Sequence, residues 1–251
     1  MATTQSECGK LYIMEDFFGG EDIVANTAAS RLLPSGFRVV GDGIAEIDSG
    51  ITVLETDPNL NGVGVFTTTD ETEHACGVCT SKMLDVAKMA PFVMECRVQF
   101  PDLDVKQFYF GLTDYNDDAM VVEGGLMTGL TETLTLTASD LCGFFYSAEL
   151  TEDEMWHFVH NGGTTTGVTD STALESAVDA VLGEYDILRL EVDNNGTARW
   201  YIDGVLLKTL AGAVSTSVDL AVLAIVETKA NSVEYAKVDY VWLSGNRDWT
   251  V

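Results

Sequence analysis

The stretch from 185 to 210 constrains the fold of this chain more than any other. It reads YDILRLEVDNNGTARWYIDGVLLKTL, and apolar residues alternate with polar ones on both sides of Asp193-Asn194-Asn195-Gly196. A period of two puts one set of side chains on a buried face and the other in water, as in a β-strand. Asp and Asn bond to their own turn backbone and Gly accepts a positive φ, so the stretch predicts a β-hairpin.

A type I turn closed by a glycine bulge would fix the register of this hairpin. It predicts five facing pairs, which are Val192 with Ala198, Leu190 with Trp200, Leu188 with Ile202, Glu191 with Arg199, and Arg189 with Tyr201. The first three pairs are apolar, and the last two join opposite charges or a cation and a ring, so both faces favour one register. A second turn at Asp203-Gly204 predicts a third strand over 205–210.

Short apolar segments separated by turn residues follow one another along the rest of the chain. We predict strands over 11–18, 37–40, 44–47, 51–55, 63–68, 93–100, 105–112, 133–137, 143–146, 156–160, 220–227 and 233–243. Segment 81–90 is either a short helix or an irregular lead-in, and 172–182 has room for a turn or two of helix. This pattern predicts an all-β, antiparallel β-sandwich in one domain over 1–251, with 1–90 the less regular part.

The charge balance of the chain limits its partners. Of its 251 residues, 13 are Lys or Arg and 40 are Asp or Glu, which gives a formal net charge of −27. Phosphate backbones would repel such a chain, so we expect no nucleic-acid partner. The N-terminus lacks a charged-then-apolar signal pattern and no run approaches a membrane span, so we expect synthesis in a cytoplasm and no membrane partner.

Two resemblances to known families follow from these segments. The hairpin sequence LRLEVDNNGTARWYIDGVLLKTL resembles the penultimate hairpin of concanavalin A-like jelly rolls, which include laminin G-like, lectin and glucanase modules. A wider resemblance is to a family of tailed-bacteriophage virion proteins. It rests on the order of PFVMECRVQF, FYFGLTDYNDD, LCGFFYSAEL, WHFVHNGG, the hairpin and VDYVWLSGNR, which together span Pro91 to Arg247.

The wider resemblance implies a non-enzymatic decoration protein that braces the outer shell of a capsid. It would be made in a host cytoplasm, lie on the virion exterior, use no cofactor, and contact the major capsid protein and other copies of itself as a homo-oligomer. Residues 1–90 would supply the anchoring contacts. The alternative is a carbohydrate-binding, lectin-like module of a phage fibre or spike, whose partners would be surface glycans.

Glycosidases of the jelly-roll fold need two Glu on one strand with an Asp between them, in the pattern Glu-x-Asp-x-(x)-Glu. Glu46-Ile47-Asp48 and Glu191-Val192-Asp193 both begin this pattern, and neither continues to the second Glu. Glu191 fits an outer-face strand position and Asp193 fits a turn. We therefore predict that the chain is not an enzyme and has no catalytic residues.

One loop has the spacing at which a calcium site begins. In Asp114-Tyr115-Asn116-Asp117-Asp118 the oxygen ligands Asp114, Asn116 and Asp118 alternate. The glycine that should follow is Ala119, and the distal Glu is replaced by Gly125. We expect a solvated acidic turn rather than a high-affinity calcium site.

Cysteine and histidine offer a second group of metal ligands. His74, Cys76 and Cys79 lie close in sequence, and His157 and His160 form a second set. Structural zinc needs two close ligand pairs, but positions three apart on a strand point to opposite faces. We predict no metal site here. Cys96 and Cys142 lie in apolar runs and are predicted to be buried thiols.

Aromatic residues are the remaining candidates for binding, because they stack on sugar rings. Trp200 and Trp242 fall on the apolar phase of their strands and are predicted to pack in the core. Tyr115, Tyr201 and Trp249 are the surface candidates. Exposed aromatic residues beside loop acids on one sheet face would favour the carbohydrate-binding alternative.

Overall fold

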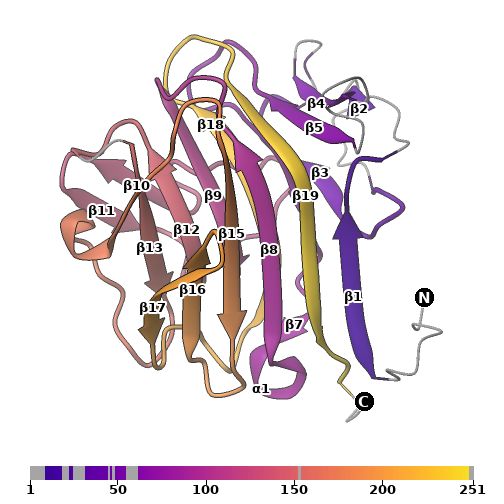
Figure 1. Ribbon diagram of the computed structural model, residues 1–251, viewed down its shortest axis with the longest axis vertical. Coiled ribbons are helices and arrows are strands. Elements are labelled where there is room, and N and C mark those ends of the chain that lie inside the picture. Colours follow the sequence, from indigo (N-terminus) through magenta and orange to yellow (C-terminus); the bar gives the residue numbers. More distant parts are fainter. Residues whose placement is uncertain are drawn as a thin grey trace.

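The computed structural model of this chain describes residues 9–18, 23–24, 32–44, 46, 49–54, 62–151 and 154–248 (Figure 1). Among these residues the strands form two large antiparallel sheets and one small sheet, so the predicted all-β antiparallel sandwich is confirmed. In the described part of the chain, helix is limited to a short α-helix, α1 (Val86–Met89), and a 3-10 turn, η1 (Ser171–Leu174). No helix within the described ranges is long and apolar enough to cross a bilayer.

The nine-stranded sheet faces the viewer in Figure 1. Its strand order is β17-β16-β15-β8-β19-β5-β4-β2, with β1 paired to β19. The bounds are β1 (Lys10–Glu15), β2 (Ile23–Val24), β4 (Gly50–Leu54), β5 (Val63–Thr67), β8 (Phe92–Gln99), β15 (Tyr185–Val192), β16 (Ala198–Ile202), β17 (Val205–Leu210) and β19 (Tyr235–Asn246).

The eight-stranded sheet packs behind the first. Its order is β14-β13-β12-β9-β18-β6-β3, with β7 paired to β18. The bounds are β3 (Arg38–Val40), β6 (Ala75–Cys79), β7 (Leu84–Asp85), β9 (Lys106–Thr113), β12 (Leu141–Ser147), β13 (Met155–Asn161), β14 (Glu175–Asp179) and β18 (Asp219–Thr228). The small sheet pairs β10 (Met127–Leu130) with β11 (Thr133–Leu136).

The main hydrophobic core lies between the two large sheets. The indole Nε1 of Trp200 donates a hydrogen bond to the carbonyl oxygen of Gly143 in the facing sheet, at 2.9 Å. The indole Nε1 of Trp156 donates to the side-chain carboxylate of Asp186 on β15, also at 2.9 Å. Both indoles are buried, and a buried indole N–H without a partner would be destabilising. Tryptophan therefore joins the sheets at two points from opposite sides.

A second hydrophobic cluster covers the outer face of the eight-stranded sheet. The segment from 120 to 138, which includes β10 and β11, packs its apolar side chains on that face. Val122 and Leu134, for example, belong to the same buried cluster as Tyr109, Phe145 and Ile225. As a result β9 and β12 are buried on both faces along their whole length. We call the segment 120–138 the cover.

The central hairpin has the predicted register. All five facing pairs, from Leu188–Ile202 to Val192–Ala198, are present. Asp193 N–H donates to Thr197 O and Gly196 N–H donates to Asp193 O, and Gly196 has φ 77°, as a type I turn with a glycine bulge requires. The ion pairs run within strands and turns rather than directly across: Arg189 pairs with Glu191, and Arg199 pairs with Asp193.

The local predictions differ from the structure at several places. The expected strand over 44–47 is replaced by turns as far as it is described, because Gly41 and Gly43 have φ of 142° and 78° and curl the chain. Segment 172–182 begins in the 3-10 turn η1, as the room for a turn of helix allowed, and continues as β14, which was not expected. Segment 81–90 contains β7 and the short helix α1, and a short helix was one of its two expected alternatives. β6 was missed because its run of small residues is buried on both faces and shows no alternation.

Trp242 is a further correction, because its side chain is half-buried on the outer face and not in the core. The register of β19 against β8 shifts between Val238 and Tyr240. A β-bulge adds one residue to a strand and so exchanges the inward and outward phases beyond it. Val241 and Leu243 therefore point into the core, and Trp242 points out.

The two turns of the hairpin region give a matched test of this packing. Gly196→Ala should destabilise the protein by about 2–3 kcal/mol, because a left-handed Ala costs roughly 1 kcal/mol and its Cβ would lie 2.3 Å from Val214 O. Gly204→Ala has the same φ and open space around it, so only the strain of about 1 kcal/mol is expected. Urea denaturation of both variants measures the difference, and equal losses would contradict the packing described.

Candidate functional site

An open pocket lies at the rim of the eight-stranded sheet, where the loop after β9 meets the loop before β12. Its lining includes Asp114, Tyr115, Asn116, Gly124, Gly125, Thr137 and Ser139, and its volume is about 450 Å³. The cover forms one wall, and the loop 114–118, which we call the acidic loop, forms the other. We call it the acidic-loop pocket.

Backbone and side-chain hydrogen bonds fix the acidic loop in place. Asp114 N–H donates to Asp140 O at 2.9 Å, and Asp140 N–H donates back to the Asp114 carboxylate at 3.1 Å. The amide of Asn116 donates to Thr80 O at 3.0 Å, which ties the loop to the end of β6. Tyr115 N–H donates to the hydroxyl of Thr113. These hydrogen bonds therefore fix the positions of the polar groups of the pocket in the unliganded protein.

Glycine makes room for the aromatic ring of this pocket. A Cβ on Gly125 would lie 2.7 Å from Cε1 of Tyr115 and 2.5 Å from Val121 O, both closer than real Cβ contacts. The backbone of Gly125 therefore approaches the Tyr115 ring as only glycine can. Burial raises the pKa of the Tyr115 hydroxyl above its usual value, with a smaller contribution from Asp117, so the ring carries a neutral phenol at pH 7.

Arg38 bonds to the loop in which the sequence has the spacing of a calcium site. Its Nη1 forms an ion pair with Asp118 at 2.5 Å, and its Nη2 donates to the side-chain oxygen of Asn116 and to Asp117 O. Asp114 instead accepts from the backbone of Asp140. Two of the three candidate ligands thus share a guanidinium. Arg38 was missed because it lies about 80 residues from the loop in sequence, where no local signal links the two.

We therefore expect no tight, stoichiometric calcium uptake when the protein is titrated in a calorimeter. A bound Ca²⁺ needs six to eight oxygen ligands, and the Arg38 guanidinium already holds Asn116 and Asp118. Tight uptake that Asp114→Ala abolishes would contradict this expectation. Arg38→Met serves as the control, because it frees both side chains while leaving the loop sequence unchanged.

Glu227 attaches the cover to β18 beside this pocket. Its carboxyl group accepts hydrogen bonds from Val122 N–H at 2.5 Å and Glu123 N–H at 3.1 Å. Burial raises the pKa of Glu227 to about 8, against the lowering effect of these hydrogen bonds. Lys229 lies nearby and pairs with Glu123 and Glu149 at 2.9 and 3.3 Å. The cover is thus fastened by a carboxyl group that stays protonated at neutral pH.

This raised pKa predicts a pH-dependent stability. Below pH 4.5, the ordinary pKa of Glu, the protonated Glu227 contributes its full share to the free energy of unfolding. This stabilisation is lost as the pH rises towards 8, because the unfolded chain releases the proton at a lower pH than the folded chain does. The expected loss is on the order of 4 kcal/mol. Glu227→Gln imitates the protonated form, so its unfolding free energy should lack this decline. Urea denaturation from pH 5 to 8 tests the pair, and parallel pH profiles would contradict the account.

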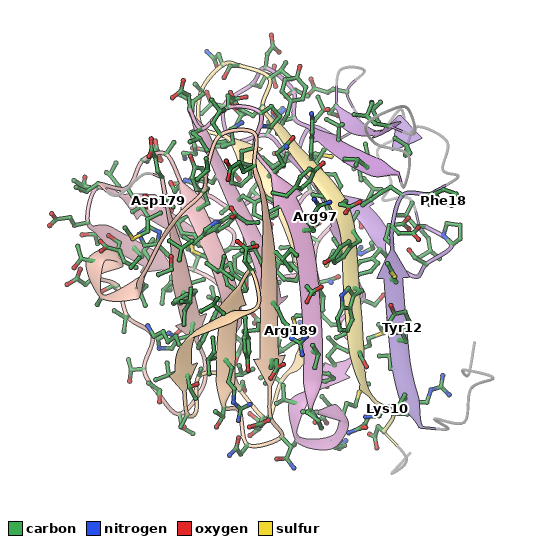
Figure 2. All side chains as sticks on the ribbon, in the orientation of Figure 1. Lys10, Tyr12, Phe18, Arg97, Asp179 and Arg189 are labelled. Carbon is green, nitrogen blue, oxygen red and sulfur yellow. The ribbon has the colours of Figure 1, made fainter. Side chains whose placement is uncertain are left out.

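The outer face of the nine-stranded sheet carries a second set of candidates (Figure 2). Tyr12, Arg97 and Arg189 are spread across the side of β1, β8 and β15 that faces the viewer. Tyr12 stacks on Trp242, with ring centroids 5.9 Å apart. Tyr201, a surface candidate from the sequence, lies on the same face, whereas Tyr115 lines the acidic-loop pocket. Trp249 lies outside the described residues.

The cysteines and histidines of the proposed zinc motif do not converge. Cys76 joins the core between the sheets, and Cys79 joins the cluster under the cover. Burial raises the pKa of each thiol to about 12. His157 pairs in register with Phe145 and His160 with Cys142, so they lie on opposite faces, as expected. Burial lowers the pKa of His157 to about 4.

His74 has carboxylate neighbours instead of thiols. Its Nε2 lies 3.2 Å from Glu71, its Nδ1 lies 3.7 Å from Glu46, and Thr69 Oγ1 contacts the same Nδ1 at 2.6 Å. Within the described ranges these three titratable residues are the one such group close enough to share an ion. Both carboxylates are exposed, and their pairing with His74 accounts for the arrangement.

The two incomplete glycosidase patterns have no catalytic arrangement in the described residues. Glu46 lies in the loop beside His74, and the rest of its motif falls outside those residues. Glu191 bonds to Arg189 and to the hydroxyl of Tyr201, and Asp193 pairs with Arg199. Arg199 lowers the pKa of Asp193, so Asp193 holds no proton at neutral pH for general acid catalysis.

Comparison with known proteins defines the fold of the chain. No family model and no curated protein matches the sequence. A protein of unknown function from Shewanella oneidensis MR-1 aligns over 99% of this chain and 92% of its own, with a TM-score of 0.59 and 10% identity. The Emp47p carbohydrate recognition domain aligns over 94% and 98%, with a TM-score of 0.54 and 12% identity.

A β-glucanase of Bacillus licheniformis is also similar, with a TM-score of 0.52 and 12% identity over 97% of this chain and all of its own. At this identity the similarity establishes the fold alone. The chain has the concanavalin A-like jelly-roll fold found in lectins and glucanases, as the hairpin sequence predicted. These structures carry no information on a capsid or a bacteriophage, so the virion role stays a prediction from the sequence.

Proposed function

We propose that the protein binds carbohydrate, with a sugar unit held in the acidic-loop pocket. One observation carries this proposal: the pocket joins an aromatic ring, a carboxylate, an amide and two hydroxyl-bearing residues beside two glycines. A sugar has an apolar ring face and a belt of hydroxyls, which need a flat ring and fixed polar partners. The shared fold with a carbohydrate recognition domain supports the same conclusion.

The same site argues for binding without hydrolysis. Glycoside hydrolysis needs two carboxyl groups on either side of the bond that breaks. The pocket contains one carboxylate, that of Asp114, and it already accepts from the backbone of Asp140. Glu227 has the raised pKa of a general acid, but its carboxyl group is buried beneath the backbone of Val122 and Glu123. We propose a binding module with no catalytic residues.

A structural role in a virion is the second candidate. It is supported by the sequence segments between Pro91 and Arg247 that resemble virion proteins, which correspond to β8, β9, β12, β13, the hairpin and β19. The capsid location, the contacts with the capsid protein and with other copies, and the homo-oligomer belong to this candidate. Mass spectrometry of purified particles tests it, and absence of the chain from every particle would exclude it.

Tyr115→Ala tests the pocket directly. A glycan array would first identify the sugar, and calorimetry would then measure its affinity. We expect about a fivefold loss in the variant, because stacking on an aromatic ring contributes about 1 kcal/mol. Tyr235→Ala removes an exposed tyrosine of β19 that does not line the pocket, and it should leave the affinity for the sugar unchanged. An array without hits, or equal losses in both variants, would contradict the proposal.

A further inference from the structure

A row of facing side chains crosses five strands on the outer face of the nine-stranded sheet. It runs from Met14 on β1 through Trp242 on β19, Glu95 on β8 and Arg189 on β15 to Tyr201 on β16. Each neighbour in the row is a direct register partner of the next. We call this set the cross-strand row.

One end of the row is aromatic and open to solvent. Tyr12 stacks on Trp242 with an interplanar angle of 26°, and 53% of its surface is exposed. The hydroxyl of Tyr12 contacts the sulfur of Met14 at 3.2 Å. The bulge in β19 produces this surface, because without it Trp242 would point into the core. The result is an exposed aromatic platform of the kind on which a sugar ring stacks.

The middle of the row is a fixed network of hydrogen bonds. The Glu95 carboxylate accepts from the hydroxyl of Tyr240 at 2.7 Å and from the indole of Trp242 at 3.3 Å. Arg189 lies between Glu95 and Glu191, at 3.9 and 2.5 Å. These groups have their geometry set by one another, so a ligand would meet them with little further loss of side-chain entropy.

The charges of the row favour a neutral ligand. Each arginine on this face already has a carboxylate partner, in the pairs Arg97–Asp239, Arg189–Glu191 and Arg199–Asp193. Arg97 also lies 3.9 Å above the ring of Tyr185. A bound anion would have to compete with those carboxylates, and the net charge of −27 would repel it at longer range.

A protein partner fits this face poorly. The core of a protein interface is depleted of charged residues, whereas the middle of this face is made of Glu95, Arg97, Arg189 and Glu191. Covering these ion pairs with protein would remove their water without a replacement. The hydroxyls of a sugar replace that water, because each one both donates and accepts.

We propose that the cross-strand row and Tyr12 bind an extended segment of a neutral polysaccharide, on a surface separate from the acidic-loop pocket. Trp242 and Tyr201 are three strand spacings apart, which is about 14 Å. One sugar ring stacks on Tyr12 and Trp242. The hydroxyls of the next sugar ring bond to the paired carboxylates and arginines, and the last sugar ring of the segment contacts Tyr201. This proposal goes beyond binding of a sugar unit in the pocket.

Affinity electrophoresis tests this proposal with three polymers in the gel: a soluble β-glucan, a galactomannan and the anionic polygalacturonate. We expect one of the neutral polymers to retard the protein, with no effect of added salt. Trp242→Ala and Tyr12→Ala should each weaken the interaction about tenfold or more. Tyr235→Ala is the matched control, because Tyr235 is exposed and lies on β19, as Trp242 does, but outside the row. This variant should bind as the wild type does.

Three results would overturn the proposal: no retardation by either neutral polymer, wild-type binding by both row variants, or salt-sensitive binding of polygalacturonate alone. Gel filtration adds a fourth, because a wild-type dimer that Tyr12→Ala converts to a monomer would identify the face as a protein interface. Tyr115→Ala separates this surface from the pocket. Tyr115→Ala should retain polymer binding, and its affinity for small sugars is measured separately by calorimetry.

Discussion

Burial of both faces of the eight-stranded sheet is the constraint on which the accessible surfaces depend. β9 and β12 pack against the other sheet on one side and against the cover on the other. A ligand therefore cannot lie across the middle of this sheet without displacing residues 120–138. The rim where the cover ends and the outer face of the nine-stranded sheet stay accessible.

The cover also explains why the pocket is rigid. Glu227 bonds to its backbone at Val122 and Glu123, and a single substitution at Gly125 would push the Tyr115 ring out of position. The acidic loop opposite is held by Arg38 and by the backbone of Asp140. The polar residues of the pocket are thus fixed from both walls, which lowers the entropy that a ligand must remove on binding.

Local sequence patterns predicted the structural features that residues close together in the sequence determine. The hairpin register followed from alternation and from the turn chemistry of Asp193 to Gly196, and the buried thiols Cys96 and Cys142 followed from their apolar runs. The position of Trp242 did not follow, because a bulge in β19 reverses the phase without leaving a mark such as glycine or proline at Asp239. The role of Arg38 could not be predicted either, since it joins segments far apart in the chain.

We infer that carbohydrate binds in the acidic-loop pocket while residues 120–138 stay packed on the eight-stranded sheet. Nuclear magnetic resonance of the amide-labelled protein, titrated with the sugar that a glycan array selects, distinguishes this arrangement from displacement of the cover. We expect shifts at Tyr115, Asn116 and Gly125, with the amides of Val122 and Phe145 unchanged. Shifts centred on Val122, Phe145 and Ile225 would show instead that the ligand displaces the cover, and binding in the pocket with the cover in place would then be wrong.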